Sequence, residues 1–447
     1  MIIKLIQPKM ILRPMDTKLK SRMAPSLALL TIANLTPEEH TIIITDENIE
    51  KINYKEKVDL VAITVTVDVS EHAYEIANKY RAAGIPVIGG GIHVSAAPEE
   101  AVENFDAICI GMAEGCWQQI LHDVENGTLK KIYDSSSELT GDKIVSPKYS
   151  IINKNRYLYT NVISTSRGCT FKCEFCYNSC EHSTKYINRP IEEVLKEINE
   201  LKTKHVMFVD DNFIGNPAWT REFLTAIKDM NLKWNAAVTS NILNYPDILD
   251  LMKETGCRSL FIGFESINAK SVSSVNKTQN SVEKYNLLIR AIHDRGIMIN
   301  ASLVFGLDFD TKDVFSKTLN WLVENRIETM TAHILTPYPG TVLYGKMLSE
   351  NRITDFNSSK YNTSNVVFKP LGMTPEELRE GYLWIYKKFY TFKNIFKRIP
   401  QNSNQKLAFV LFNIFYRKYG RITCILASII TFGVLGRFAR KIGYRIK

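Results

Sequence analysis

Four cysteines lie within one short segment of the chain, residues 167–180, whose sequence is RGCTFKCEFCYNSC. Cys169, Cys173 and Cys176 form a C-x3-C-x2-C array, and Phe175 directly precedes the third cysteine. Thiolates at this spacing bind zinc or an iron–sulfur cluster, because cysteine sulfur is a ligand for both. The array therefore predicts a metal site.

The number of ligands separates the two kinds of metal site. A structural zinc ion needs a fourth ligand, and Cys180 or His182 is near enough in sequence to supply it. A four-iron cluster held by three cysteines instead keeps one iron open to a substrate. Both kinds of site stay open on this evidence, and Cys180 is most simply a spare thiol. Eight cysteines in 447 residues are too sparse for a disulfide scaffold, so we expect a reducing compartment.

Short apolar runs alternate with helical patterns over residues 1–135. Runs of β-branched and almost wholly apolar residues are typical of parallel strands covered on both faces. They predict a doubly wound α/β domain with its ligand crevice at the carboxyl ends of the strands. A polar stretch that begins at residue 132 predicts a linker, which we place at 136–157. The expected strands are 2–6, 41–46, 59–65, 86–91 and 106–111.

A second alternation of strands and helices covers residues 158–365. Six βα units predict a partial TIM barrel, a (βα)6 fold with its chemistry on the loops that follow the strands. The cysteine array directly follows the first of these strands, where such a barrel places its active site. The expected strands are 160–166, 205–211, 234–240, 258–264, 297–306 and 329–336.

The last region, 366–447, is helical in pattern and strongly basic. Residues 391–447 hold 12 Lys or Arg and no Asp or Glu, which accounts for the formal net charge of +9. Two apolar runs, 407–416 and 422–436, are each shorter than the roughly 20 residues that span a bilayer. They predict either a peripheral anchor on an anionic membrane surface or helices that pack on the barrel or in a dimer interface. So much aliphatic surface disfavours nucleic acid as the partner.

Taken together, the cysteine array, the aromatic residue before its last cysteine and its place after the first barrel strand resemble the radical S-adenosylmethionine (SAM) superfamily. The resemblance implies that Cys169, Cys173 and Cys176 ligate a 4Fe-4S cluster. It also implies that SAM chelates the open iron through its amino and carboxylate groups. Reductive cleavage of SAM would then give a 5′-deoxyadenosyl radical that abstracts hydrogen.

Later barrel segments extend this resemblance. Asp210 and Asp211 end the second strand and resemble the segment that contacts the SAM amino group, because an acidic pair favours an ammonium partner. A pair that caps the next helix is the alternative. His333, near the end of the sixth strand, would line the substrate cavity or serve as a core residue. The residues for which the resemblance implies SAM contacts are Phe175, Asp210, Asp211, Glu265, Ser266, Ser302 and Gly306.

A doubly wound domain ahead of such a barrel resembles the cobalamin-binding branch of the superfamily, which includes class B methyltransferases and the ring cyclase of bacteriochlorophyll synthesis. The likeness rests on segments 25–33, 64–70, 89–101 and 111–115. The D-x-H-x-x-G pattern, by which many cobalamin proteins supply an axial histidine, is absent. The resemblance implies cobalamin, with a scaffold domain as the alternative. The candidate cobalamin residues are Thr64, Gly89, Gly90, Gly91, His93, Gly111 and Glu114.

The predicted function is that of a radical SAM enzyme, a cobalamin-dependent methyltransferase that acts on an unactivated carbon of an apolar or natural-product-like substrate. One alternative is a radical carbon–carbon bond-forming or cyclising enzyme with a scaffold first domain. The other is a non-catalytic zinc-binding protein. The expected partners are a small-molecule or lipid substrate and an electron donor such as flavodoxin or ferredoxin, and the expected location is the cytoplasm, with the basic tail on the inner face of the membrane.

Overall fold

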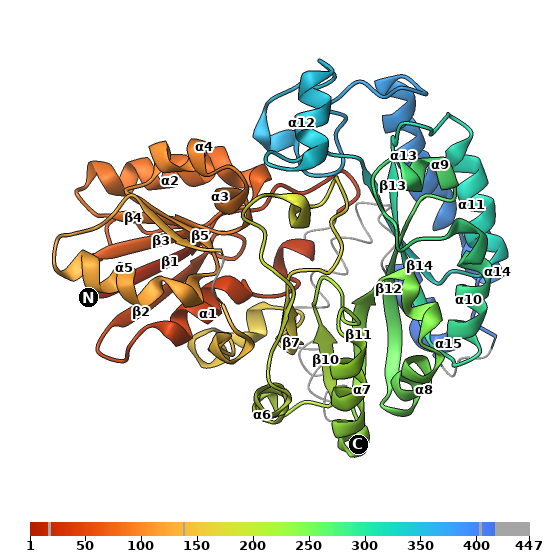
Figure 1. The fold of residues 1–447 in the computed structure, drawn as a ribbon, viewed down its shortest axis with the longest axis horizontal. Helices are drawn as coiled ribbons and strands as arrows, with labels where there is room; N and C mark the ends of the chain where they lie inside the picture. The colour runs from red at the N-terminus through yellow and green to blue at the C-terminus, as the bar shows by residue number, and fades with distance from the viewer. Residues whose placement is uncertain (17–18, 137–138, 402–404, 416–447) are drawn as a thin grey trace.

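The computed structural model describes residues 1–16, 19–136, 139–401 and 405–415. Two α/β units lie side by side, and each is built around its own parallel sheet. The N-terminal unit is on the left in Figure 1 and the barrel unit is on the right.

The first sheet has six parallel strands in the order β2-β1-β3-β4-β5-β6. The order of strands reverses between β1 and β3, which is where a doubly wound sheet opens a ligand crevice. The predicted doubly wound fold is confirmed. The strands are β1 (Ile2–Gln7), β2 (Thr41–Asp46), β3 (Leu60–Thr64), β4 (Val87–Gly90), β5 (Ala107–Gly111) and β6 (Ile132–Ser135).

The sequence pattern does not predict β6, which falls at the start of the polar stretch. Only Tyr133 of its four residues is buried, so the strand lacks the apolar run that marks its neighbours. It forms the edge of the sheet, and the hydroxyl of Tyr133 donates to Asp123 Oδ2 at 2.7 Å. An edge strand held by one aromatic residue and its hydrogen bond leaves little periodicity to detect.

Helices cover both faces of the first sheet (Figure 1). Ile3 and Leu5 of β1 pack towards α1 and α5, whereas Ile6 belongs to the core on the side of α2. Alternate residues of one strand thus enter two different cores, which explains why the strands are apolar almost throughout. The helices are α1 (Leu27–Leu35), α2 (Ser70–Ala82), α3 (Ile92–Ala96), α4 (Pro98–Asn104) and α5 (Trp117–Glu125).

The second sheet is also parallel, in the order β14-β13-β12-β11-β10-β7. Its two outer strands, β7 and β14, are at opposite ends of the sheet, which is therefore an open, partial barrel as predicted. A short antiparallel pair, β8 (Ser166–Arg167) and β9 (Ile187–Asn188), brackets the cysteine loop. The barrel strands are β7 (Val162–Ile163), β10 (His205–Phe208), β11 (Lys233–Val238), β12 (Cys257–Glu265), β13 (Met298–Phe305) and β14 (Thr329–Ile334).

Six helices follow or separate these strands and face the outside of the barrel (Figure 1). One large core joins them to the sheet, with Phe208, Phe223 and Trp234 buried in edge-to-face contact. The barrel helices are α6 (Ile191–Leu201), α7 (Pro217–Ala226), α8 (Pro246–Glu254), α9 (Ala269–Ser273), α10 (Tyr285–His293) and α11 (Val314–Glu324).

The outer edge of β14 is covered by α13 (Pro375–Phe389), which begins with a capping box formed by Thr374 and Glu377. The hydroxyl of Tyr386 donates to the Ala332 carbonyl at 3.0 Å and accepts from its N–H at 2.8 Å. Tyr390 bonds the backbone of Met330 in the same way. Two tyrosines thus satisfy backbone groups that an open sheet edge would leave unpaired.

The chain after α13 continues on the barrel through α14 (Phe392–Lys397) and α15 (Lys406–Phe415). Arg398 is fully buried and donates to the carbonyls of Ile327 and Glu328 at 2.7 and 2.8 Å. It also reaches Asn413 of α15 at 3.4 Å. The packing alternative for the run 407–416 therefore holds for its described part, while the run 422–436 lies outside the described residues.

Among the described residues, no helix combines the length and the apolar character that crossing a membrane requires.

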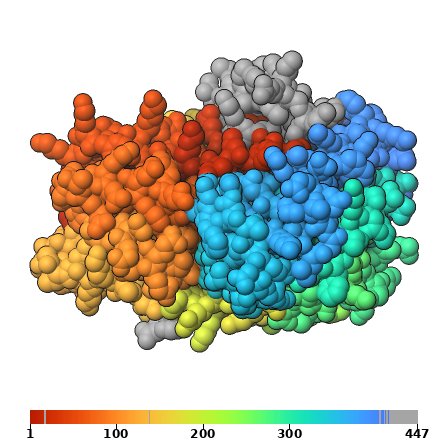
Figure 2. Space-filling view, turned by 90° about the horizontal axis from the view of Figure 1, so that it is seen from above, coloured from red at the N-terminus to blue at the C-terminus, as the bar shows by residue number. Residues whose placement is uncertain are grey.

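The described residues between β1 and α1, 8–16 and 19–26, lie along the seam between the two units (red in Figure 2). The carbonyls of Arg22 and Met23 accept backbone N–H groups from residues 158 and 159 at 2.8 and 2.7 Å. Across the same seam, Arg156 pairs with Glu50 at 2.6 Å. These contacts fix how the first unit faces the mouth of the barrel. The helix α12 (Val342–Ser349) also lies at this seam, beside the first unit (Figure 2).

Candidate functional site

The cysteine array lies on the loop between β8 and β9 at the mouth of the barrel. The loop starts at Gly168, whose φ of +72° and distance of 2.4 Å from a would-be Cβ to the Thr184 carbonyl oxygen exclude larger residues. Inside the loop, the Cys176 N–H donates to the Cys173 carbonyl at 2.9 Å. The backbone thus turns so that the three thiols share one loop.

The thiols have surroundings that suit sulfur ligands. Cys173 is buried, and Gln279 Nε2 donates to its Sγ at 3.6 Å. Asn178 Nδ2 donates to Cys176 Sγ at 3.5 Å. Burial raises the pKa of the Cys176 thiol to about 11 and also raises the pKa of Cys169. Metal coordination removes such protons, and N–H donors to sulfur are ordinary partners of iron–sulfur ligands. The donor set therefore fits a cluster held by three cysteines.

The sequence offered Cys180 or His182 as the fourth ligand of a zinc ion. Cys180 is buried at the end of the loop, and burial raises the pKa of its thiol to about 11. His182 Nδ1 lies 3.9 Å from Asp134 Oδ2, a residue of the first unit. Within the described part of the chain, no group of three His, Cys, Asp or Glu side chains is arranged to hold a single metal ion.

The two acids at the end of β10 have different surroundings. Asp210 is buried, and its Oδ1 accepts from the N–H groups of Thr165 and Ser166 at 2.8 and 2.5 Å and from both of their hydroxyls. Burial raises the pKa of Asp210. Asp210 was expected to contact the SAM amino group, but its Oδ1 is occupied by the turn before the cysteine loop.

Asp211 lines a cavity at the mouth of the barrel, as Asp210 does, and is the exposed one of the two. Partial burial nevertheless raises its pKa, while Asn178 and Arg167 act in the opposite direction. Asn178 also contacts Cys176, so Asp211 faces the cavity from beside the cysteine loop.

Glu265 is the last residue of β12, and Ser266 follows it. Both were expected to contact SAM, but both side chains already have partners within the protein. Glu265 is buried in an ion pair with Lys277, a residue that sequence reasoning missed. The backbone of Glu265 has a φ of +61°, which is rare for a residue with a side chain and which accompanies a shift of strand register. Ser266 Oγ accepts from the Asn268 N–H at 3.1 Å, so it stabilises the following turn.

The remaining expected SAM residues lie in or next to the barrel core. Ser302 is buried in β13. Gly306 has a φ of +93°, and a Cβ there would come within 2.6 Å of Leu378, so its glycine makes room for α13. This packing role of Gly306 differs from the SAM contact that the resemblance implies. Phe175 packs against the barrel core beside the cysteines.

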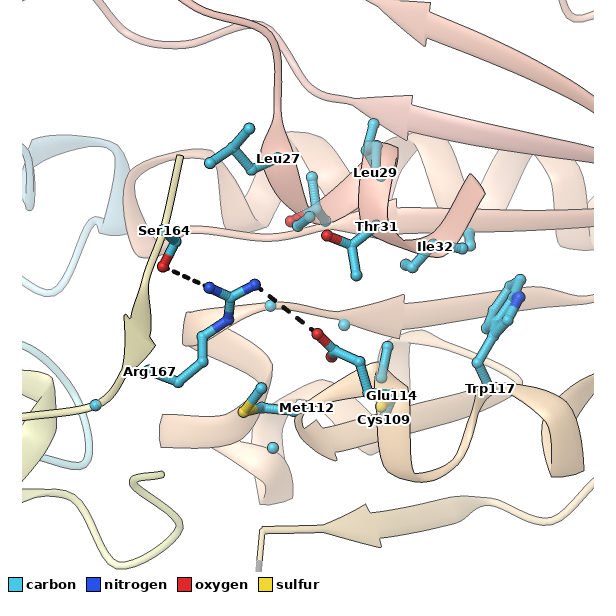
Figure 3. Close-up of a pocket in the computed structure, with 18 of the residues that line it drawn as sticks. Leu27, Leu29, Thr31, Ile32, Cys109, Met112, Glu114, Trp117, Ser164 and Arg167 are labelled. Atoms are coloured by element: carbon cyan, nitrogen blue, oxygen red, sulfur yellow. Dashed lines mark hydrogen bonds and ion pairs between the residues drawn. The ribbon is translucent and has the colours of Figure 1, made fainter. Parts of the chain in front are cut away.

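A cavity of about 370 Å³ lies between the carboxyl edge of the first sheet and the start of the cysteine loop (Figure 3). Figure 3 shows its apolar end at Ile32 and Trp117 and its charged end at Arg167 and Glu114. We call it the first cavity. The expected cobalamin residues that line it are Thr64, Gly90, Gly91, Gly111 and Glu114.

The glycines of the first cavity form a cradle. A Cβ on Gly90 would find no atom closer than Cys109 Cβ at 3.9 Å, so its position leaves open space beside the cavity. Gly91 and Gly111 have φ values of +104° and +80°, which only glycine adopts readily. A bare backbone at the carboxyl edge of the sheet allows a large ligand to approach closely, which fits cobalamin.

Two expected cobalamin residues do not line this cavity. A Cβ on Gly89 would lie 2.3 Å from the Phe105 ring, so this glycine serves packing within the first unit. His93 is buried, with its Nε2 3.5 Å from Glu100 Oε1, and so contacts α4 and not the ligand crevice. Spacing could not distinguish Gly89 from Gly90, because neighbouring residues of a strand face opposite sides.

Arg167 connects the two units inside the first cavity (Figure 3). Its Nη1 donates to Ser164 Oγ at 2.5 Å, and its Nη2 lies 3.8 Å from Glu114 Oε1. Glu114 is a side chain of the first unit that is 5% exposed. Apart from its place two residues before Cys169, nothing in the sequence pattern predicts a role for Arg167.

A second cavity, of about 630 Å³, lies at the same seam. It is lined by the segment 8–26, by the ends of β2 and β3, and by barrel residues that include Tyr177, His333 and Tyr338. Tyr177 and Tyr338 stack with ring centroids 4.8 Å apart. His333, which was expected to line the substrate cavity or to serve as a core residue, lines this cavity, and its Nδ1 lies 3.3 Å from Arg13 Nη1.

Comparison with known protein families gives three matches. Residues 163–322 match the radical SAM superfamily, and residues 24–121 match the B12 binding domain. Residues 341–441 match a domain of unknown function, DUF4070.

Curated relatives align over most of the chain. The bacteriochlorophyllide d C-8(2)-methyltransferase of Chlorobaculum tepidum is 30% identical over 88% of this chain and 91% of its own. The C-12(1)-methyltransferase of the same organism is 29% identical over 80% and 81%. An anaerobic magnesium-protoporphyrin IX monomethyl ester cyclase of Cereibacter sphaeroides is 24% identical over 75% and 60%.

Solved structures show the same fold. The radical SAM methyltransferase TsrM from Kitasatospora setae, with cobalamin and a 4Fe-4S cluster bound, has a TM-score of 0.64 and 17% identity over 78% of this chain and 75% of that one. The cobalamin-dependent enzyme OxsB, with aqua-cobalamin and SAM bound, has a TM-score of 0.67 and 15% identity over 99% and 75%.

These matches overturn the zinc interpretation of the cysteine array, and the scaffold interpretation of the first domain with it. Sulfur donors on the barrel loop and a glycine cradle on the first sheet are the groups that the two cofactors need. The chain belongs to the radical SAM superfamily, in the branch with a B12-binding domain ahead of the barrel, and is an enzyme whose cofactors are a 4Fe-4S cluster, SAM and cobalamin.

Proposed function

We propose that this enzyme is a cobalamin-dependent methyltransferase that acts on an unactivated carbon of a small, largely apolar molecule. One observation carries the proposal: the first cavity is lined both by Gly90 and Glu114 of the cobalamin unit and by Gly168 and Asp211 beside the cysteine loop. Cofactors held by the two units would therefore share one space. When bound, the cluster with SAM supplies hydrogen abstraction, and cobalamin supplies the methyl group.

The chain's own residues would divide the work of binding. Cys169, Cys173 and Cys176 would hold the cluster. Asp211 lines the first cavity and is the carboxylate that would bind the SAM ammonium. A hydrogen bond between two such charged groups is stronger than one between neutral groups. Asp210 would act indirectly, by fixing the turn at Thr165 and Ser166 before the cysteine loop.

The cobalamin would lie on the glycine cradle of the first unit. We assign contacts with it to Thr64, Gly90, Gly91 and Gly111, which line the first cavity. Arg167 would hold the barrel side of this cavity against Glu114 of the cobalamin unit.

The second cavity is our proposed substrate site. Its volume of about 630 Å³ is in the range of small-molecule pockets. Apolar side chains such as Met10 and Val67, together with the stacked Tyr177 and Tyr338, would cover the body of a largely apolar substrate. Arg13, which bonds Thr363 Oγ1 at 3.0 Å, provides a polar end. Tyr177 directly follows Cys176, which places this cavity beside the cysteine loop.

Two partner predictions complete the proposal. An electron donor such as flavodoxin or ferredoxin would reduce the cluster. The basic tail would hold the enzyme at an anionic membrane surface, which agrees with an apolar substrate; a chain truncated after residue 415 should then no longer sediment with anionic vesicles.

The decisive experiment follows the methyl group and does not require the substrate. The enzyme is reconstituted anaerobically with iron, sulfide and hydroxocobalamin, reduced, and mixed with SAM that carries a trideuterated methyl group. We expect four irons and about one cobalt per chain, and deuterated methylcobalamin by mass spectrometry. SAM cleavage without labelled methylcobalamin would contradict methyl transfer and favour the cyclising alternative.

A further inference from the structure

The segment 275–280, which follows α9, packs directly against the cysteine loop. The Glu174 N–H donates to the Val275 carbonyl at 3.1 Å, and Asn276 Nδ2 donates to the Lys172 carbonyl at 3.5 Å. Gln279 Nε2 then reaches the Sγ of Cys173 at 3.6 Å. Backbone and side chains from about 100 residues away therefore enclose the middle cysteine of the array.

This segment places a buried cation beside the sulfur ligands. The side chain of Lys277 is 7% exposed and pairs with Glu265, whose side chain is equally buried. Its Nζ lies 5.9 Å from the centre of the Phe175 ring, between two cysteines in sequence. A Cβ on Gly263 would come within 2.7 Å of the same Nζ, so the strand leaves this space free for the pair.

The lysine carries its charge in this position. Burial would lower the pKa of Lys277, but Glu265 and the nearby cysteines outweigh that effect and raise it. Charges interact strongly in such surroundings, because little water screens them.

Glu265 does not make this cation redundant. At long range the negative charge of Glu265 cancels the positive charge of Lys277. At short range the ammonium of Lys277 is the charge that acts on Cys173 and Cys176. Gln279 acts in the same sense, because an N–H donor stabilises negative charge on sulfur. Both groups thus favour the more negative, reduced state of whatever the cysteines hold.

We propose that Lys277 and Gln279 raise the reduction potential of the cluster, Lys277 as a buried cation and Gln279 as an N–H donor to Cys173. Both are positioning residues of the electron-transfer step and are not expected to contact the substrate. The inference rests on the cluster and not on methyl transfer, so it holds or fails whatever group the enzyme transfers.

The test is the midpoint potential of the reconstituted cluster, measured by electron paramagnetic resonance during a redox titration without SAM. Lys277→Met should lower the potential most, because it also leaves the Glu265 carboxylate alone beside the cysteines. Lys277→Met combined with Glu265→Gln should lower it less, and Gln279→Leu should lower it as well. Lys277→Arg keeps the charge and should stay near the wild-type value. Lys228→Met, which removes a surface cation paired with Glu254, is the control and should change nothing.

The double variant keeps the test valid if the single lysine variant does not fold, since it buries no unpaired charge. Equal potentials in the double variant and the wild type would overturn the role of Lys277 and reduce it to a partner for Glu265. Unchanged potentials with weaker SAM binding, measured by equilibrium dialysis, would likewise overturn the proposal and make Lys277 an anchor for the SAM carboxylate. An unchanged potential in Gln279→Leu would overturn the role of the amide.

Discussion

The cysteine loop and the first cavity are two different kinds of binding site. The loop offers a chemical donor set, three thiols within eight residues, whereas the cavity offers a shape built from α1, the ends of three strands and the turn before the cysteines. The loop is therefore visible in the sequence as residue types. The cavity is visible only as positions where a side chain is missing or small.

This difference determines which mutations each site tolerates. A donor set fails when one donor is removed, because no neighbour replaces a sulfur ligand. A cavity that binds by its shape loses its ligand when a side chain is added, but it can still bind after the loss of a single polar contact. The four predictions below test that contrast.

The largest effect is expected for Cys173→Ala. Loss of one of three sulfur ligands should abolish the cluster, and with it all SAM cleavage. Iron per chain and SAM-derived products measure this directly. Cys180→Ala, in the same loop, is the matched control and should keep four irons; SAM cleavage by Cys173→Ala would contradict the ligand assignment.

Gly90→Leu should break the cavity and leave the cysteine loop intact. The open space beside Gly90 admits the new side chain without backbone strain, so the protein should fold and bind iron while its cobalamin content falls about tenfold or more. Cobalt and iron counts on the same sample separate the two cofactors. Gly345→Leu, at an exposed position with nothing within 4 Å of a Cβ, is the control. Full cobalt in Gly90→Leu would place the cofactor elsewhere.

The neighbouring acids should behave in opposite ways. Asp210→Ala removes the acceptor of four hydrogen bonds and should lower the free energy of unfolding by about 1–3 kcal/mol. Asp211→Ala should leave stability nearly unchanged and weaken SAM binding about tenfold, as expected for one charged hydrogen bond. Urea unfolding and equilibrium dialysis measure the two effects. Normal SAM binding by Asp211→Ala would remove it from the site.

The smallest effect is expected for Arg167→Met, the residue that belongs to both sites. Its pair with Glu114 is long and partly exposed, and such pairs contribute about 0.2–1 kcal/mol, so cobalamin affinity should fall by no more than about fivefold. Titration of the apoprotein with hydroxocobalamin provides the affinity. Glu114→Gln should give a similar loss, and the double variant should add little to it. Strictly additive losses would show that the two residues act separately.

The sequence predicts the fold well where strands are apolar on both faces. Ten of its expected segments have strands of four residues or more, whereas β7 has only two residues and β6 is missed. Both short strands lie in segments where polar residues interrupt the apolar run, IYDS at 132–135 and TNVISTS at 160–166, so they carry no long apolar run.

For the sites, residue type predicts less than it suggests. His93 and Gly89 look functional in the sequence, but one bonds Glu100 and the other makes room for Phe105. Glu265 looks like a ligand-binding carboxylate, but it is paired with Lys277. In each case a contact within the protein explains the residue, and only the fold shows which groups are close enough to make that contact.

The sequence by itself determined that three thiols share one short loop as the donor set of a metal site, because ligands at this fixed spacing need no distant segment to bring them together. The tertiary structure alone decided which glycines border the first cavity, that Asp210 is buried there whereas Asp211 is exposed, and that Gln279 lies against Cys173 with the buried Lys277 two residues before it. The physical reason is the range of the interactions. Local spacing sets a ligand array, whereas burial, charge and open space depend on segments that are about 100 residues apart in the chain.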